Sequence, residues 1–116
     1  MHTVGNFIDG SFLSAKSGKT LNDLNPATEK IVATIPRSQA EDVERAVTAA
    51  HSAQDGWSKL TLEQRADWLD KIADALEKKT EQIAQTESMD TGKPISLARR
   101  VDAARSVSNF RFFARK

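Results

Sequence analysis

A chain of 116 residues with 39% hydrophobic residues has room for one small domain with a modest core. It contains no cysteine, which excludes a disulfide framework, a cysteine-based metal site and a thiol nucleophile. The net charge of +1 hides an asymmetry, because residues 93–116 carry seven basic side chains against one acidic side chain. The side chains of this basic segment are either solvated or paired with acidic surface elsewhere in a larger parent protein, or the segment binds an acidic protein or nucleic acid.

The first five residues lack the basic flank and apolar stretch of a secretory signal, and no apolar run is long enough to span a membrane. We therefore expect a cytoplasmic protein whose terminus, including His2, is disordered. Further along, Asp9-Gly10 readily adopts the positive backbone angles of a tight turn and is flanked by apolar residues, which predicts a hairpin over residues 6–13.

Two more extended segments follow the hairpin. Residues 20–24 end at Asn25-Pro26, where proline fixes its own φ and disfavours helix at the preceding residue. Residues 31–35 are rich in β-branched side chains and predict a strand that Pro36 stops.

From residue 38 the hydrophobic period changes from two to 3.6, which indicates helices. Ser38 and Glu41 have the spacing of a capping box and predict a helix over about residues 39–54, broken by Asp55-Gly56. The apolar face of this helix is predicted to contain Val43, Ala46, Val47, Ala50 and Trp57.

Thr61 and Gln64 repeat the capping-box spacing and start a second predicted helix. The pattern is interrupted before Thr80, which can begin a fresh helix; Gly92 stops that helix and Pro94 opens the last one. The predicted apolar stripe of the second helix is Leu62, Ala66, Leu69, Ile72, Ala73 and Leu76, and that of the last helix is Leu97, Val101, Ala104 and Val107.

The predicted fold class is thus α+β, with a short β-hairpin and strands over residues 6–35 followed by three or four α-helices over residues 39–116. Chemistry-bearing residues are few, since His2 and His51 lie far apart and no glycine-rich phosphate loop or nucleophile elbow is present. We predict no catalytic residue. We expect Trp57 and Trp68 to pack between helices, and the cluster of Phe110, Phe112 and Phe113 to be buried against a neighbour that is missing from this chain.

Arg105 borders the predicted inward stripe of the last helix, where an unpaired guanidinium is costly and usually has an anionic partner. The residues alone leave two partners equally open. One is the carboxylate of Asp102, three positions earlier, and the other is an anionic ligand.

Four motifs resemble, in order and spacing, the N-terminal segment of the aldehyde dehydrogenase superfamily. They are Asn6-Phe-Ile-Asp-Gly-Ser-Phe12, Asn25-Pro-Ala-Thr-Glu29, Glu87-Ser-Met-Asp-Thr-Gly-Lys-Pro94 and Arg105-Ser-Val-Ser-Asn-Phe-Arg-Phe-Phe-Ala114. Within the superfamily, the last motif resembles the branch that oxidises 2-aminomuconate and 2-hydroxymuconate semialdehydes, which includes an enzyme of tryptophan breakdown by the kynurenine route. The resemblance implies that residues 1–116 are part of a discontinuous NAD-binding domain. The Rossmann strands, catalytic part and oligomerisation part would then lie outside this chain.

The resemblance also implies partners and cofactors. The parent enzyme would be NAD-dependent, would act on a small-molecule aldehyde and would form a homodimer or homotetramer, with no nucleic acid or membrane partner. NAD would be bound mainly by the missing portion, and the remainder of the parent would pack on this segment, which alone would be inactive.

Two site predictions come from the resemblance. Arg105, on a helix that lines the substrate tunnel, would bind the substrate carboxylate with its fork of parallel N–H donors. The main-chain carbonyl of Leu24 and the carboxylate of Asp90 would bind a structural monovalent cation, although Asp90 can instead cap the turn at Thr91-Gly92. The rival interpretation is a truncated, non-catalytic helical interaction module whose basic last helix binds an acidic partner.

Overall fold

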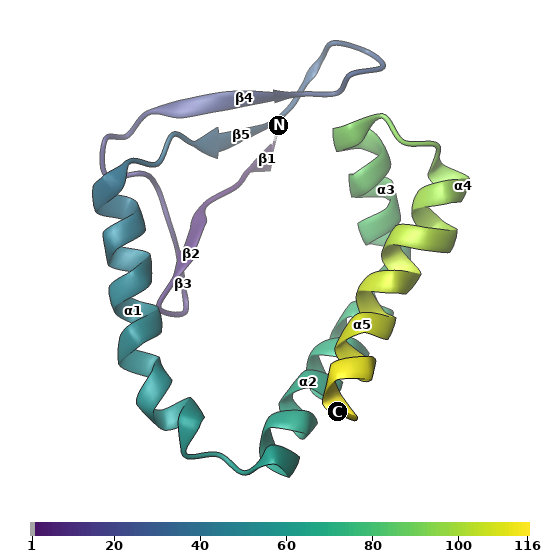
Figure 1. Ribbon diagram of the computed structural model, residues 1–116. Coiled ribbons are helices and arrows are strands. Elements are labelled where there is room, and N and C mark those ends of the chain that lie inside the picture. Colours follow the sequence, from purple (N-terminus) through teal and green to yellow (C-terminus); the bar gives the residue numbers. More distant parts are fainter. Residues whose placement is uncertain (1) are drawn as a thin grey trace. The chain divides into compact units, whose positions relative to one another are not determined.

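The computed structural model describes residues 2–116, which divide into a first unit ending at Lys59 and a second unit beginning at Leu60 (Figure 1). The first unit holds all the strands and one helix, and the second unit is helical. The prediction of short strands followed by three or four helices is therefore confirmed. Within residues 2–116, no helix is both long and apolar enough to cross a membrane.

The strands of the first unit form two small sheets. In the three-stranded sheet, β5 (Ile31–Pro36) lies between β1 (His2–Thr3) and β4 (Thr20–Leu24), parallel to β1 and antiparallel to β4. The prediction of a disordered terminus is wrong for residues 2 and 3, because their backbone pairs with Ala33 and Thr34. The strand β5 also continues through Pro36, one residue beyond the predicted stop.

The second sheet is the predicted hairpin, formed by β2 (Asn6–Ile8) and β3 (Ser11–Leu13). Asp9 and Gly10 have φ angles of 51° and 75°, so both central residues of the two-residue turn are left-handed, as the twist of a tight hairpin requires. The rings of Phe7 and Phe12 face each other across the strands with centroids 5.0 Å apart.

The helix α1 (Ala40–Ser58) departs from the prediction at both ends. It runs through Asp55-Gly56, because one glycine lowers helix stability by only about 1 kcal/mol and Asp55 gains an ion pair with Lys59 at 2.6 Å. The capping box lies one residue later than predicted, since the Gln39 N–H donates to Asp42 Oδ2 at 2.9 Å. Ser38 instead accepts a hydrogen bond from the Asn6 side chain, at 2.8 Å.

The second unit contains α2 (Leu62–Glu77), α3 (Thr80–Thr91), α4 (Ile95–Leu97), the π-helix η1 (Ala98–Ala103) and α5 (Ala104–Ala114). The predicted capping box of Thr61 and Gln64 is confirmed, with bonds of 2.9 and 3.2 Å. The break before Thr80 and the stop at left-handed Gly92, whose φ is 74°, are also confirmed. The helix α5 lies along α2, and η1 packs on α3 (Figure 1).

The π-helix makes the predicted stripe of the last helix wrong, except at Val107. Each π-turn holds one residue more than an α-turn, so Ala98 and Ala103, five positions apart, share the buried face. Both are fully buried against Ala84 of α3, and Val107 continues this face in α5. The predicted inward residues Leu97, Val101 and Ala104 are exposed as a result.

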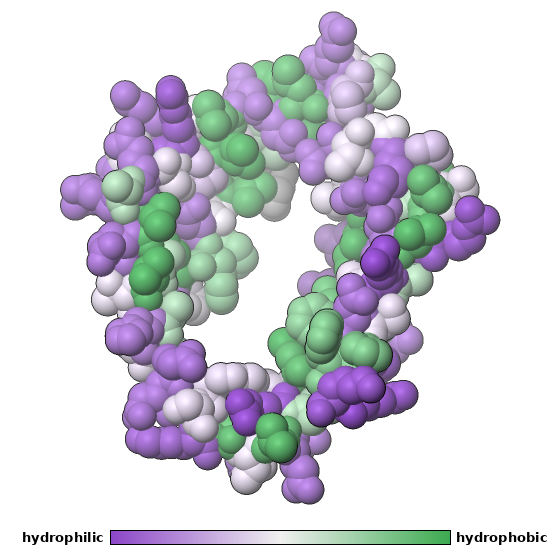
Figure 2. Space-filling model, in the orientation of Figure 1, coloured by the Kyte–Doolittle hydropathy of each residue, from purple (hydrophilic) through white to green (hydrophobic). Residues whose placement is uncertain are grey.

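Large apolar side chains lie mainly at the surface of each unit, as the green areas of Figure 2 show. On α1, Ala46 and Ala49 are partly covered, whereas Val43 and Val47, two predicted members of its apolar face, are exposed. The buried residues are chiefly alanines, and the most exposed large side chains include Phe7, Phe12, Leu62, Trp68, Phe112 and Phe113. Apolar surface of this extent is typical of a segment that packs against further protein.

Candidate functional site

The turn that ends α3 fixes the backbone of Lys93. The Gly92 N–H donates to the carbonyl of Ser88 at 3.0 Å, and the Ser88 hydroxyl donates to the carbonyl of Lys93 at 2.7 Å. The Thr91 hydroxyl accepts from the Lys93 N–H at 3.3 Å. Within residues 2–116 the side chains that hold this turn are therefore those of Ser88 and Thr91, so the alternative that Asp90 caps the turn is wrong.

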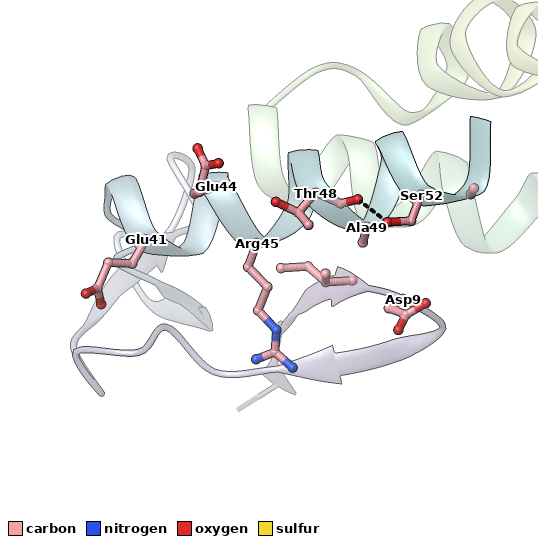
Figure 3. A pocket seen from close by; sticks show the side chains of 9 residues that line it. Asp9, Glu41, Glu44, Arg45, Thr48, Ala49 and Ser52 are labelled. Carbon is pink, nitrogen blue, oxygen red and sulfur yellow. Dashed lines mark hydrogen bonds between the residues drawn. The ribbon is translucent and has the colours of Figure 1, made fainter. Parts of the chain in front are cut away.

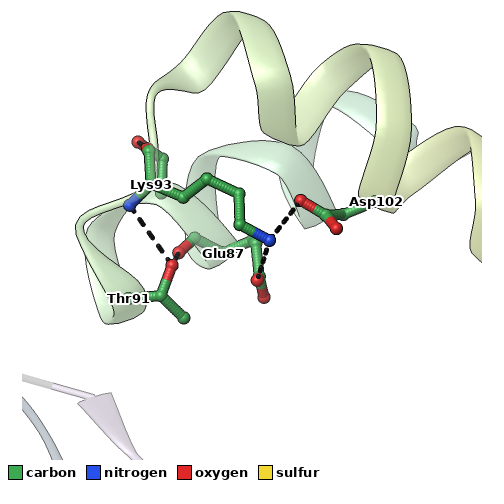
Figure 4. A network of polar contacts seen from close by, with 5 residues as sticks. Glu87, Thr91, Lys93 and Asp102 are labelled. Carbon is green, nitrogen blue, oxygen red and sulfur yellow. Dashed lines mark hydrogen bonds and ion pairs between the residues drawn. The ribbon is translucent and has the colours of Figure 1, made fainter.

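The Lys93 ammonium connects the turn after α3 to both α3 and the π-helix η1 (Figure 4). Its Nζ atom lies 2.7 Å from Asp102 Oδ2 in η1 and 3.3 Å from Glu87 Oε1 in α3. Together these three side chains form what we call the Lys93 network. The hydrogen bond to Asp102 is the main cause that raises the pKa of Lys93 above its ordinary value. The ammonium consequently stays charged at neutral pH.

Arg105 lies in the first turn of α5 and is exposed, rather than bordering the buried face as predicted. The π-turn explains the difference, because it shifts the buried face to Ala103 and Val107. Within the second unit, residues 60–116, no carboxylate lies within ion-pair distance of the Arg105 guanidinium, and Asp102 is paired with Lys93. The alternative in which Arg105 pairs with Asp102 is therefore contradicted, and the binding of a substrate carboxylate by Arg105 stays a prediction.

Other basic residues of the last helical segment are paired inside the unit. Arg99 makes a bidentate contact to Glu81 at 2.8 and 2.6 Å, which lowers the pKa of Glu81 to about 2. Arg111 donates to Asp74 at 2.8 Å and to Glu77 at 2.7 Å, both on α2. Three of the seven basic side chains of residues 93–116, those of Lys93, Arg99 and Arg111, are thus paired with acidic side chains of the same unit.

The two residues predicted to bind a monovalent cation belong to different units. Leu24 ends β4 in the first unit, next to a bulge in the ladder, and Asp90 lies in the last turn of α3 in the second unit. Both offer oxygen atoms, the ligand type of a hard cation. Within residues 2–116 no cluster of three or more His, Cys, Asp or Glu side chains is arranged to hold a metal ion. The cation site stays a prediction.

The first unit has a groove of about 740 Å³ between α1 and the hairpin, which the sequence did not indicate. Figure 3 shows Arg45 extending from α1 toward the hairpin, with Asp9 at the hairpin turn and Glu41 and Glu44 on α1. The Ser52 hydroxyl donates to the carbonyl of Thr48 at 2.9 Å, so this hydroxyl is engaged by its own helix.

Comparison of the amino-acid sequence with known proteins identifies relatives of this chain. Residues 12–116 match the aldehyde dehydrogenase family. The chain is 45% identical over 109 residues to 2-aminomuconic semialdehyde dehydrogenase of Bos taurus, covering 94% of this chain and 22% of the relative. It is 36% identical over 115 residues to 2-hydroxymuconic semialdehyde dehydrogenase of Pseudomonas sp. (strain CF600), covering 98% of this chain and 24% of the relative.

Solved structures agree with this relationship. The NAD+ complex of an aldehyde dehydrogenase from Bacillus cereus superposes with a TM-score of 0.93 at 40% identity, covering 97% of this chain and 23% of that chain. The present chain therefore spans about a quarter of the length of the proteins it matches, and its structure corresponds to a segment of their fold.

Proposed function

The chain belongs to the aldehyde dehydrogenase family, and we propose that it is the N-terminal part of an NAD-dependent enzyme that oxidises a semialdehyde to a carboxylic acid. The proposed substrates are of the 2-aminomuconate or 2-hydroxymuconate semialdehyde class. Two relatives named for such substrates, at 45% and 36% identity, support this class. The observation that carries the choice of an acidic substrate is the Arg105 guanidinium, which is exposed and has no carboxylate within ion-pair distance inside the second unit, residues 60–116.

Arg105 would bind the carboxylate at the end of the substrate opposite the aldehyde. A guanidinium presents parallel N–H donors that match the two carboxylate oxygens, and it stays charged at every physiological pH. Its placement on a helix, rather than on a loop, fixes the direction from which it meets the substrate. The rest of the chain serves as scaffold for this residue and offers Leu24 and Asp90 as ligands of a structural monovalent cation.

The chemical step would take place outside this chain. The chain has no cysteine, so the thiolate that attacks the aldehyde must come from another part of the parent enzyme. When bound there, NAD would accept the hydride of the aldehyde carbon, and water would complete the conversion to the acid. The similarity to an NAD+ complex supports this choice of cofactor. The proposal also includes a cytoplasmic homodimer or homotetramer acting in tryptophan breakdown by the kynurenine route, as the family resemblance implies.

A panel of aldehydes tests this function. The parent enzyme should produce NADH, followed by its absorbance, with a higher kcat/KM for 2-hydroxymuconate semialdehyde than for a neutral aldehyde of similar length. The isolated 116-residue chain should produce none with either substrate. An equal kcat/KM for the two aldehydes would contradict the substrate class, and turnover by the repurified isolated chain would contradict the placement of the chemistry outside it.

A further inference from the structure

Resting on the proposed role of Arg105, we propose that Lys93 is a positioning residue for substrate selection. Its ammonium holds the Asp102 carboxylate away from the Arg105 guanidinium, so that Arg105 remains available to the carboxylate of a substrate.

The competition arises from the spacing along the helix. Asp102 precedes Arg105 by three residues, and oppositely charged side chains at this spacing are neighbours on a helix surface. Without a third partner, Asp102 is the nearest carboxylate in the sequence that Arg105 can pair with. An intramolecular carboxylate in this place would compete with the carboxylate of a substrate.

The structure supplies the third partner. Lys93 Nζ lies 2.7 Å from Asp102 Oδ2, whereas no carboxylate of the second unit, residues 60–116, lies within 4.0 Å of the Arg105 guanidinium. The choice of partner follows from burial. The side chains of Lys93 and Asp102 are each 31% exposed, whereas Arg105 lies at the exposed surface. Because attraction between charges weakens as water surrounds them, Asp102 pairs more strongly with Lys93 than with Arg105.

Contacts with α3 and with the turn that ends it fix the position of Lys93. Ser88 and Thr91 bind the backbone of Lys93, and Glu87 contacts its ammonium from α3 at 3.3 Å, as Figure 4 shows for the three labelled network residues and Thr91. Asp102 lies in the π-helix, which packs on α3 through Ala98 and Ala103. The network therefore holds Asp102 on the α3 side of the helix.

The first test uses the 116-residue chain with nitrogen-15 NMR of the arginine side chains. Lys93→Met removes the ammonium but keeps much of the side-chain length. The Asp102 carboxylate should then pair with the Arg105 guanidinium. This pairing should shift the Arg105 Nε–H resonance and slow the exchange of that proton with solvent. In the double variant Lys93→Met/Asp102→Asn the resonance should return to its wild-type position. The Arg100 resonance, from an exposed arginine of the adjoining π-helix η1, is the control. An Arg105 resonance that is unchanged in Lys93→Met would overturn the proposal.

The second test measures selection in the parent enzyme. Lys93→Met should lower the ratio of kcat/KM for an acidic over a neutral aldehyde by roughly two- to fivefold, the strength of an exposed ion pair, mainly through KM of the acidic substrate. The double variant should restore the ratio, and Asp102→Asn alone should leave it at or above the wild-type value. A purely structural role predicts instead that both substrates lose kcat/KM together and that Asp102→Asn is as damaging as Lys93→Met.

Arg105→Ala distinguishes a failure of the proposed function from a failure of the proposed role of Lys93. If Arg105→Ala changes the ratio and Lys93→Met does not, the role of Lys93 is refuted and the proposed function stands. If neither variant changes the ratio, the proposed function fails, and the role of Lys93 fails with it.

Discussion

Val107→Ala and Val101→Ala together test the register that the π-helix gives to the last helical segment. Val107 is 7% exposed and Val101 is 36% exposed, although an uninterrupted α-helix would place both on the inward stripe. Each substitution removes two methyl groups and introduces alanine, the residue with the highest helix propensity. The difference between the two variants therefore reports burial alone.

The expected losses follow from the exposed fractions. Removing two buried carbons at about 0.8 kcal/mol each, with a small cavity, lowers the free energy of unfolding by about 1.5 to 2.5 kcal/mol. The higher helix propensity of alanine returns roughly 0.5 kcal/mol, so Val107→Ala should lose about 1 to 2 kcal/mol. At Val101, less apolar surface is lost from burial, and the higher helix propensity of alanine nearly offsets that loss. The free energy of unfolding of Val101→Ala should therefore stay within about 0.5 kcal/mol of the parent chain.

Urea unfolding of the 116-residue chain measures these losses. Trp68 lies in the second unit, so its fluorescence in a Trp57→Phe background reports that unit separately. The two variants should have the same m-value as the parent chain, and the midpoint should fall only in Val107→Ala. Equal losses in the two variants would show that the last segment is an uninterrupted α-helix, and the account of Arg105 exposure would then be wrong.

Two further outcomes are expected. The pKa of Asp42 is lowered by hydrogen bonds from the Gln39 N–H and the Lys16 N–H, so its stabilising contribution is present above its ordinary pKa of 3.8 and is lost as the pH falls through the lower folded value. Thermal melting should accordingly show that Asp42→Asn lowers Tm at neutral pH and that the difference from wild type shrinks in acid; a gap independent of pH would refute this. The isolated chain should self-associate in sedimentation velocity, because its large apolar side chains are exposed. A monodisperse monomer with a sharp transition at high temperature would favour a self-sufficient interaction module.

Several elements could be predicted because their causes are local. The Asp9-Gly10 turn, the Thr61–Gln64 capping box and the Gly92 stop each depend on a few adjacent residues, and the structure has all three. The capping box of Gln39 and Asp42 was predicted one position too early, at Ser38 and Glu41. Gln39 and Asp42 also have the spacing of a capping box, with an acidic residue three positions after a polar one.

Other features depend on contacts between distant residues. The two-residue strand β1 exists through pairing with β5, about thirty positions later, and nothing local indicates it. The π-helix forms where Ala98 and Ala103 pack on Ala84 of α3, and hydrophobic periodicity assumes an α-helical repeat. The exposure of Arg105 follows from that turn, and the pairing of Asp102 with Lys93 joins residues nine positions apart, so the surroundings of Arg105 could not be predicted from the sequence.

The central claim is that Arg105 binds the carboxylate of an acidic semialdehyde in the parent enzyme. A charge-assisted bidentate contact contributes about 1.5 to 3 kcal/mol, so Arg105→Ala should lower kcat/KM for a muconate semialdehyde by roughly ten- to a hundredfold. The same variant should leave kcat/KM for a neutral aldehyde nearly unchanged. Arg100→Ala, at an exposed arginine of the adjoining π-helix η1, is the matched control and should change neither value. A ratio of acidic to neutral kcat/KM that is the same in Arg105→Ala as in wild type would contradict the claim.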